Sequence, residues 1–335
     1  MANDPIVGFP APLGAPPVYE QPEPPRESSA PPEPHRPRVW LHVTLFGLTV
    51  LSMQVTAMNL NGAAPGNWIV GYAAYQAVSL IGILLVHELG HYIAARLHRV
   101  PASPPYFLPL PLIGLFGTLG AVITMNGRIR SRKALLDIGA AGPIAGMVVA
   151  LPVLYFGLCM SEVGPRSTGH YIQEGQSILY WAMKRLVFGP IGPDQDVQLH
   201  PMAFAGWGGL FLTMINLLPW GQLDGGHIAF ALFGKRQHHF ARWFRRALLL
   251  AFAYNVYLFV VPVLRGQSSQ SLWEAAMNAM FWLVWYGITG AMASLSGEEH
   301  PPFEPGPLGR GRQLVAIGCL VLFVLLFLPT PVAAY

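Results

Sequence analysis

Long apolar blocks, separated by short polar stretches, set the pattern of the chain from Val39 onward. Most of them approach the 20 or so residues that an α-helix needs to cross about 30 Å of hydrocarbon. We predict about seven transmembrane helices, which cover residues 40–58, 69–97, 134–160, 202–233, 247–264, 276–293 and 313–331. The pattern therefore predicts an all-α polytopic membrane protein.

Composition agrees with this interpretation. The 335 residues are 53% hydrophobic and 11% charged, with a mean hydropathy of +0.43, whereas soluble domains carry about 25% charged residues. Two cysteines, Cys159 and Cys319, lie inside apolar blocks. A disulfide framework and a cysteine zinc site are both excluded by so few cysteines.

The basic residues give the predicted orientation. With the N-terminus in the cytoplasm, 16 of the 20 Lys and Arg residues fall on the inner side, as the positive-inside rule requires. The net charge of +4 is therefore explained by membrane topology, and no nucleic-acid partner is needed.

Residues 1–38 differ from the rest of the chain. Twelve of them are proline, and few are large aliphatic residues. Such a segment cannot bury enough apolar surface to fold. We predict a disordered, Pro-rich cytoplasmic tail, either a solvated spacer or a docking arm, followed by a transmembrane domain over residues 39–335.

Chemistry enters in the second apolar block, which ends "LLVHELGHYIAARLHR". His87 and His91 are four residues apart, so both imidazoles share one helix face. By helical rise they lie about 14 Å and 7 Å inside the level of Arg96. With Glu88 they form the HExxH pattern of two zinc ligands and a general base. The alternative is a set of hydrogen-bonded core groups, but ionisable residues inside a membrane are usually functional.

A catalytic zinc usually has three protein ligands. Of the acidic residues after Glu88, two lie within predicted spans, Asp137 and Asp224. Asp137 follows "RSRKALL", where we expect it to pair with Arg or Lys. Asp224 follows Pro219 and Gly221, which must interrupt the helix, and lies at the depth of the histidines. Asp224 is the predicted third ligand.

"HELGH" and "NLLPWGQLDGGH" together closely resemble the site-2 protease family of intramembrane zinc metallopeptidases, over roughly residues 69–233. The resemblance implies that Asp224 completes the metal site and that Asn216 helps to bind the substrate or the transition state. Many bacterial members insert a PDZ domain between the two motifs, but the loop at 161–201 is too short for one. The chain therefore resembles the compact branch. Within that loop, "SILYWAMKRLVFG" predicts an interfacial helix with Tyr180 and Trp181 at the headgroup level.

The segment "PASPPYFLPLPLIGLFGTLGAVITM" follows the predicted zinc-binding helix. Its prolines forbid a regular helix, yet it is too apolar for a solvated loop. We predict a re-entrant hairpin, and Gly117 and Gly120 match the glycines of a similar hairpin in the family. A substrate strand could add to its edge there, although a plain structural plug is the alternative. Gly142 and Gly146 are spaced for close helix packing.

These features together predict a zinc metalloendopeptidase that cuts single-span membrane proteins within or near the bilayer. The resemblance implies release of a membrane-tethered regulator. A bacterial plasma membrane is the simplest location, with a plastid envelope or thylakoid also open. Two alternatives remain: a chaperone or transporter on the same fold, and a chamber-type membrane zinc protease that acts on soluble or prenylated chains.

Overall fold

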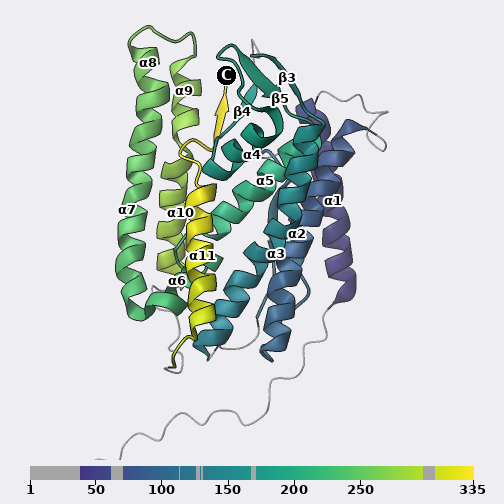
Figure 1. Ribbon diagram of the computed structural model, residues 1–335, viewed down its shortest axis with the longest axis vertical. Coiled ribbons are helices and arrows are strands. Elements are labelled where there is room, and N and C mark those ends of the chain that lie inside the picture. The colour runs from purple at the N-terminus through teal and green to yellow at the C-terminus, as the bar shows by residue number, and fades with distance from the viewer. Residues whose placement is uncertain are drawn as a thin grey trace, which may run out of the picture. The chain divides into compact units, whose positions relative to one another are not determined.

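Helices lying side by side form most of the structure, a computed structural model that describes residues 38–61, 71–112, 114–125, 129, 131–166, 171–296 and 306–335. The predicted Pro-rich tail lies outside the described residues, apart from Arg38. The helices are α1 (Val39–Asn61), α2 (Tyr72–Leu97), α3 (Arg132–Cys159), α4 (Ile178–Phe188), α5 (Pro201–Asn216), α6 (Asp224–Phe233), α7 (Gln237–Asn255), α8 (Val261–Leu264), α9 (Leu272–Ala279), α10 (Phe281–Ser296) and α11 (Arg310–Leu326). Figure 1 shows that most of them run between the same two ends.

Four helical stretches in the described part of the chain are long and apolar enough to cross a membrane. They are Val39–Leu60, Ala73–Leu97, Arg132–Cys159 and Asp224–Leu264. The prediction of a mainly helical protein with membrane-spanning helices is therefore confirmed, while the count of seven stays a prediction. The predicted block 247–264 begins ten residues earlier than expected, because α7 starts at Gln237 and continues through η3 (Val256–Val260) into α8.

The centre of the structure consists of α2, α3 and α5, which pack against one another, with α6 packed on α3. Large apolar side chains fill the space between them, and Leu80, Leu154 and Met214 are fully buried. Small residues bring the helices close together. A Cβ on Gly206 of α5 would lie 2.6 Å from the Cα of Leu154 in α3, so only glycine fits at this crossing.

Three short antiparallel strand pairs correct the all-α prediction. β1 (Tyr106–Pro109) pairs with β2 (Thr118–Val122), β3 (Glu162–Pro165) pairs with β5 (Gln195–Gln198), and β4 (Ile172–Glu174) pairs with β6 (Val332–Ala334). Strands of three to five residues are too short for the alternation of polar and apolar positions to stand out from loop sequence. The sequence pattern therefore did not reveal them.

The Pro-rich segment after α2 is confirmed as a hairpin, formed by β1 and β2, and its re-entry into the membrane stays a prediction. Side chains of α1 bind its backbone. Ser52 Oγ donates to the carbonyl of Gly117, and the N–H of Leu112 donates to Thr56 Oγ1 at 3.1 Å. Backbone groups at membrane depth must be satisfied by protein, so the polar face of α1 makes this irregular segment tolerable beside apolar helices.

The strands β3 to β6 and α4 together form a unit that we call the cap, at the end where α2 begins (Figure 1). The predicted helix over "SILYWAMKRLVFG" is confirmed as α4. Trp181 is exposed as expected, but placing Tyr180 at the headgroup level was wrong. Tyr180 is fully buried and its hydroxyl donates to Glu174 Oε1 at 2.9 Å, because it faces the cap and not the outside.

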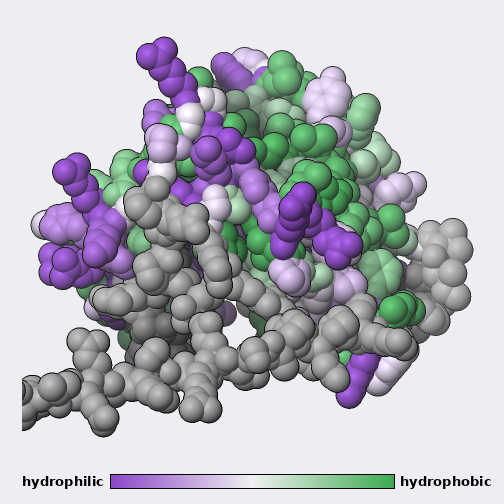
Figure 2. Space-filling view, turned by 90° about the horizontal axis from the view of Figure 1, so that it is seen from below, coloured by the Kyte–Doolittle hydropathy of each residue, from purple (hydrophilic) through white to green (hydrophobic). Residues whose placement is uncertain are grey.

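The opposite end of the helices carries many basic residues. Arg96 lies at the end of α2, Arg132 and Lys133 begin α3, and Arg310 and Arg312 begin α11. Figure 2 views this end and shows hydrophilic side chains gathered between hydrophobic ones. Clustering at one end is what the positive-inside interpretation requires.

Candidate metal centre

The helix α2 carries the first three candidate residues. His87 and His91 are one helical turn apart and point in the same direction, as the i, i+4 spacing predicts. Glu88 follows His87 directly. The exposed fractions of the three residues are 4%, 7% and 5% for His87, His91 and Glu88. Polar groups this deeply buried need partners.

Asp224 reaches these histidines because the fifth helix of the chain is interrupted, as the sequence predicted. α5 ends at Asn216, and the chain turns through Pro219 and Gly221, whose φ of +53° favours glycine, before α6 begins at Asp224. A Cβ on Gly225 would lie 2.7 Å from the carbonyl oxygen of Leu218, so glycine is required there too. The carboxylate stands in the first turn of α6, where the helix dipole favours negative charge.

Three side-chain atoms from these helices form a nearly equilateral triangle. His87 Nε2 and His91 Nε2 are 3.1 Å apart, and Asp224 Oδ2 lies 3.3 Å from the first and 3.2 Å from the second. Ligands at about 2.0–2.1 Å from a tetrahedral zinc lie about 3.3 Å from one another. The donor set and its spacing therefore fit a zinc ion with one coordination position left open.

The imidazole of His91 is held in the tautomer that a metal needs. Its Nδ1 lies 2.7 Å from the carbonyl oxygen of Ile138 in α3. A carbonyl only accepts, so Nδ1 carries the proton and Nε2 keeps a free lone pair for the metal. Asn216, at the end of α5, places its Nδ2 3.3 Å from His87 Nε2. The structure thus brings Asn216 to the edge of the three-residue group.

Glycines of α3 make room for both imidazoles. A Cβ on Gly142 would overlap the ring of His91, and one on Gly146 would lie 3.1 Å from His87 Nδ1. The close approach that the glycine spacing predicted is confirmed between α2 and α3. The sequence did not show that these glycines face the histidines, because spacing alone does not say which neighbour a helix face contacts.

Asp137 has a separate task, as predicted. Its carboxylate accepts hydrogen bonds from Arg312 Nε at 2.9 Å and Nη2 at 2.8 Å, and it lies 2.8 Å from His98 Nε2. These contacts tie the ends of α2, α3 and α11 together. The group of three potential ligands found among the described residues is His87, His91 and Asp224, without Asp137.

The two hairpin glycines differ in their surroundings. Gly117, with φ +69°, packs on α1, where a Cβ would lie 2.7 Å from Thr56 Oγ1. The expectation that Gly117 leaves space for a substrate is therefore corrected: α1 occupies that space. Gly120, with φ +100°, has no atom within 4 Å of a Cβ position among the described residues. The hairpin is open at Gly120 and closed at Gly117.

Arg132 supports the helix that carries Asp224, a role that sequence reasoning missed. Its Nε donates to the carbonyl of Ala231, and its Nη2 donates to that of Leu232 at 2.9 Å. These are carbonyls of the last turn of α6, which have no partner within the helix. Arg132 thereby ties the helix that begins with Asp224 to the start of α3. Its basic character was visible in the sequence, but its partner was not.

Two histidines and one carboxylate, which lie together between apolar helices, could hold a metal ion. Comparison with known proteins gives the family. The model of peptidase family M50 matches residues 75–260. The chain therefore belongs to peptidase family M50, the zinc-dependent family of site-2 proteases, and is an integral membrane protein.

Several relatives are plant proteins. The chain is 30% identical over 198 residues to "Probable zinc metalloprotease EGY2, chloroplastic" of Oryza sativa subsp. indica, covering 58% of this chain and 35% of that protein. It is 36% identical over 165 residues to "Probable zinc metalloprotease EGY1, chloroplastic" of Arabidopsis thaliana, covering 48% and 29%. The Arabidopsis EGY2 protein is 28% identical over 264 residues, covering 75% and 41%.

The chain thus spans between about three tenths and two fifths of these relatives' length. Their names place them in chloroplasts, so the comparisons give no support to the bacterial plasma membrane expected from the sequence.

Proposed function

We propose that this protein is an intramembrane zinc metalloendopeptidase that hydrolyses peptide bonds of single-span membrane proteins. The observation that carries the proposal is the triangle of His87, His91 and Asp224, with sides of 3.1–3.3 Å, buried between apolar helices. Membership of peptidase family M50 supports the same activity. Among the described residues, the third potential ligand is an aspartate, Asp224, and not a glutamate. This favours the proposed class over the chamber-type protease, in which the third ligand is usually a glutamate.

His87, His91 and Asp224 would hold the zinc ion, which, when bound, would supply a Lewis acid that makes water more acidic and a carbonyl group more electrophilic. Glu88 then acts as the general base: its carboxylate accepts a proton from the attacking water. The same carboxyl group returns that proton to the leaving amine as the peptide bond breaks. Burial of Glu88 excludes bulk water from this exchange.

Asn216 is the candidate for holding the carbonyl oxygen of the substrate. Its amide lies beside His87 and so at the edge of the metal position, where an N–H donor would stabilise negative charge developing on that oxygen. Gly117 and Asn216 therefore have different roles: Gly117 is needed for the backbone conformation of the hairpin, and Asn216 lies beside the proposed reaction site.

The substrate is expected to approach along the hairpin. β1 contacts α1, whereas β2 contacts both α1 and α2, the helix that carries His87 and His91. In the described residues β2 pairs with β1 alone, so its second edge is free for an extended chain. The open space at Gly120 lies on this strand. A transmembrane helix must unwind to be cut, because its own hydrogen bonds shield its peptide groups, and strand addition would hold it unwound.

The substrates proposed are single-span membrane proteins, with release of a membrane-tethered regulator as the outcome. The basic end of the helices, which carries Arg96, Arg132 and Arg312, is proposed to face the cytoplasm or its equivalent compartment. The metal centre then lies nearer to that side, and the cap lies on the other.

Glu88→Gln tests the activity most simply. The purified full chain should keep its zinc, because Glu88 is not one of the three ligands. Its kcat/KM on a single-span substrate should fall by about 10²–10⁴-fold, the contribution of a general base. Glu162→Gln, a change at an exposed glutamate of β3, is the matched control and should cleave at the wild-type rate. Equal cleavage by Glu88→Gln and wild type, with zinc bound in both, would remove Glu88 as the general base, and no cleavage by the zinc-loaded wild type would remove the protease proposal.

A further inference from the structure

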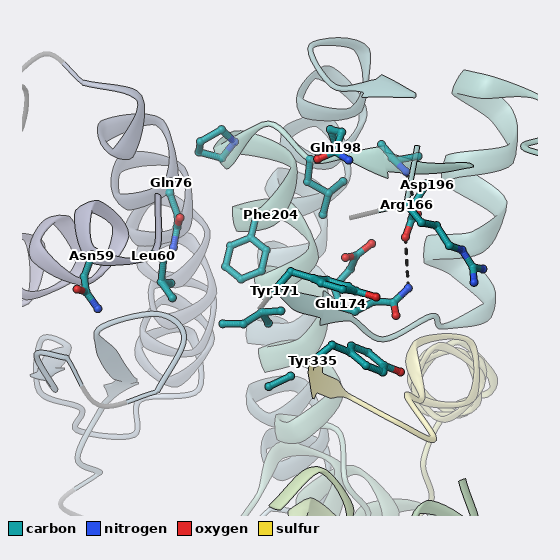
Figure 3. A pocket seen from close by; sticks show the side chains of 16 residues that line it. Asn59, Leu60, Gln76, Arg166, Tyr171, Glu174, Asp196, Gln198, Phe204 and Tyr335 are labelled. Carbon is teal, nitrogen blue, oxygen red and sulfur yellow. Dashed lines mark hydrogen bonds between the residues drawn. The ribbon is translucent and has the colours of Figure 1, made fainter. Parts of the chain in front are cut away.

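A cavity of about 650 Å³ lies beside the cap, at the end of the helices away from the basic residues. Figure 3 shows Asn59 and Leu60 of α1 and Gln76 of α2 on one wall, and Arg166, Glu174 and Asp196 of the cap on the other. None of the described residues of the metal centre or of the hairpin lines it. It is a separate site.

The cavity stands at a fixed distance from the metal centre along α2. Gln76 lines the cavity and His87 is eleven residues further along the same helix. At 1.5 Å per residue this is about 16 Å. An extended chain rises about 3.3 Å per residue. About five residues of an unwound substrate would therefore reach from the cavity to the metal.

Among the described residues, β4 pairs with β6 alone, so its other edge has no paired strand. Tyr171 and Tyr335 exchange both backbone hydrogen bonds, at 2.9 Å each. In an antiparallel pair, hydrogen-bonded and non-bonded residues alternate. Ile172, which lines the cavity, therefore turns its N–H and C=O away from β6.

The strand β5 presents a second edge. Arg166 N donates to the carbonyl of Asp194 at 3.1 Å, which sets the alternation between β3 and β5. Val197 falls on a position that points away from β3, and its N–H is bound by the neighbouring Asp196 side chain at 2.8 Å. Val197 also lines the cavity. Two strand edges thus border the same space, bridged by a bond of 3.3 Å from Gln173 Nε2 to Asp196 Oδ2 (Figure 3).

The charges around the cavity are balanced. Glu174 and Asp196 line it, and the buried Lys184 lies 3.2 Å and 3.4 Å from their carboxylate oxygens. Arg166 supplies a second positive charge on the same wall. Side-chain amides of Asn59 and Gln198 add hydrogen-bonding groups without charge. Such a lining matches a neutral, polar peptide backbone better than a strongly charged ligand.

The size of the cavity sets the length of that peptide. A strand residue occupies roughly 3.3 by 4.8 by 10 Å, or about 160 Å³. The cavity therefore holds about four extended residues. Peptides that add to a strand edge gain affinity from main-chain bonds, and neighbouring pockets select their side chains.

We propose that this cavity binds the segment of a single-span substrate that emerges from the membrane on the cap side, as an extended strand of about four residues. This inference rests on the proposed protease function and adds a recognition site to it. The bound segment lies about five residues from the scissile bond, so the cavity also sets where the substrate is cut.

The test compares substrates that share one transmembrane segment. One carries a six-residue neutral polar stub on the cap side, a second lacks the stub, and a third has proline at alternate stub positions, which removes N–H donors. With the full-length wild-type protein and zinc, the first should have a kcat/KM about tenfold higher than the other two, mainly through KM, as expected for the loss of one or two backbone hydrogen bonds. A two-residue insertion between stub and transmembrane segment should move the cleavage site by two residues.

Ile172→Pro removes the N–H that points to the cavity without removing a β4–β6 bond, and Val163→Pro is its matched control. By the same alternation Val163 turns its N–H away from β5, and it does not line the cavity. In Ile172→Pro, the ratio of kcat/KM with the stub to kcat/KM without it should fall from about tenfold to near one, because one or two backbone hydrogen bonds to the stub are lost. In Val163→Pro this ratio should stay near tenfold. Binding of the fluorescent stub peptide alone, followed by anisotropy, should weaken in Ile172→Pro alone.

The outcomes separate the two proposals. Equal cleavage with and without the stub, or equal stub binding by wild type and Ile172→Pro, would overturn the recognition site and leave the protease standing. Cleavage of neither substrate would refute the protease, while the anisotropy measurement would still decide whether the cavity binds the peptide.

Discussion

Two imidazoles occupy space at the centre of this protein that α3 leaves empty. Gly142 and Gly146 face His91 and His87, and the carbonyl of Ile138 in the same helix fixes the tautomer of His91. The metal centre is therefore shaped by α3 as much as by the helices that carry the ligands. Interactions of this supporting kind typically change metal affinity by about 10–100-fold.

Gly142→Ala tests this contribution. A Cβ at this position would overlap the His91 ring, so the ring must move and the triangle of donor atoms must open. We expect zinc affinity to fall by at least about tenfold, measured by competition with a chelator. Gly82→Ala in α2 is the control, because no described atom lies within 4 Å of its Cβ position. Unchanged zinc affinity in Gly142→Ala would show that α3 tolerates a side chain there.

At this scale the sequence predicted what the structure brings together: His87, His91 and Asp224 lie in one group, and Asp137 lies apart. This grouping could be predicted because i, i+4 spacing and a Pro–Gly interruption are local signals, while the role of the three residues as metal ligands stays a prediction. The role of Gly117, by contrast, depends on a contact between residues far apart in the sequence. Its neighbour is Thr56, which is 61 residues away in the sequence, and no local pattern could reveal that contact.

Among the elements, the cap is held by a buried ion group. Lys184 of α4 contacts Glu174 of β4 and Asp196 of β5, and Tyr180 of α4 donates to the same Glu174. Burial, with the nearby Glu174 carboxylate, raises the pKa of Tyr180 well above its ordinary value, so the hydroxyl stays a donor. One helix and two strands are thereby joined at a single point.

Lys184→Ala should loosen the cap. Without its ammonium group, the largely buried Glu174 carboxylate and the partly buried Asp196 carboxylate lose their shared counter-charge, which costs about 3 kcal/mol of the free energy of unfolding. A lower Tm in detergent is the expected measurement. Arg185→Ala changes the next, exposed basic residue and should leave the Tm near that of the wild type. If both variants melt together, the ion group does not hold the cap.

Long helices were predicted well from the sequence, and short strands were not. The apolar helices α1, α2 and α3 were expected within a few residues of where they lie, because burial or lipid contact on every side leaves a continuous apolar run. α7 was placed too late, because its first turns carry charged residues that resembled a loop. Strands β3 to β6 were missed, since their pairing depends on partners up to 162 residues away, as between Ile172 and Ala334.

Over the whole molecule, the helices separate two sites along one direction. The metal centre lies towards the basic end, and the cavity lies beside the cap, about 16 Å away along α2. A spanning substrate that unwinds along the hairpin would contact both. The distance along α2 between Gln76 and His87 would then determine how far from the bound segment the substrate is cut.

The central claim is that His87, His91 and Asp224 together hold one zinc ion. Zinc content per chain, measured by inductively coupled plasma mass spectrometry on purified protein, tests it most directly. Wild type and Asp137→Ala should each carry one zinc, because Asp137 binds Arg312 and His98 and not the metal. Asp224→Ala should lose nearly all of it. A full zinc content in Asp224→Ala would contradict the account.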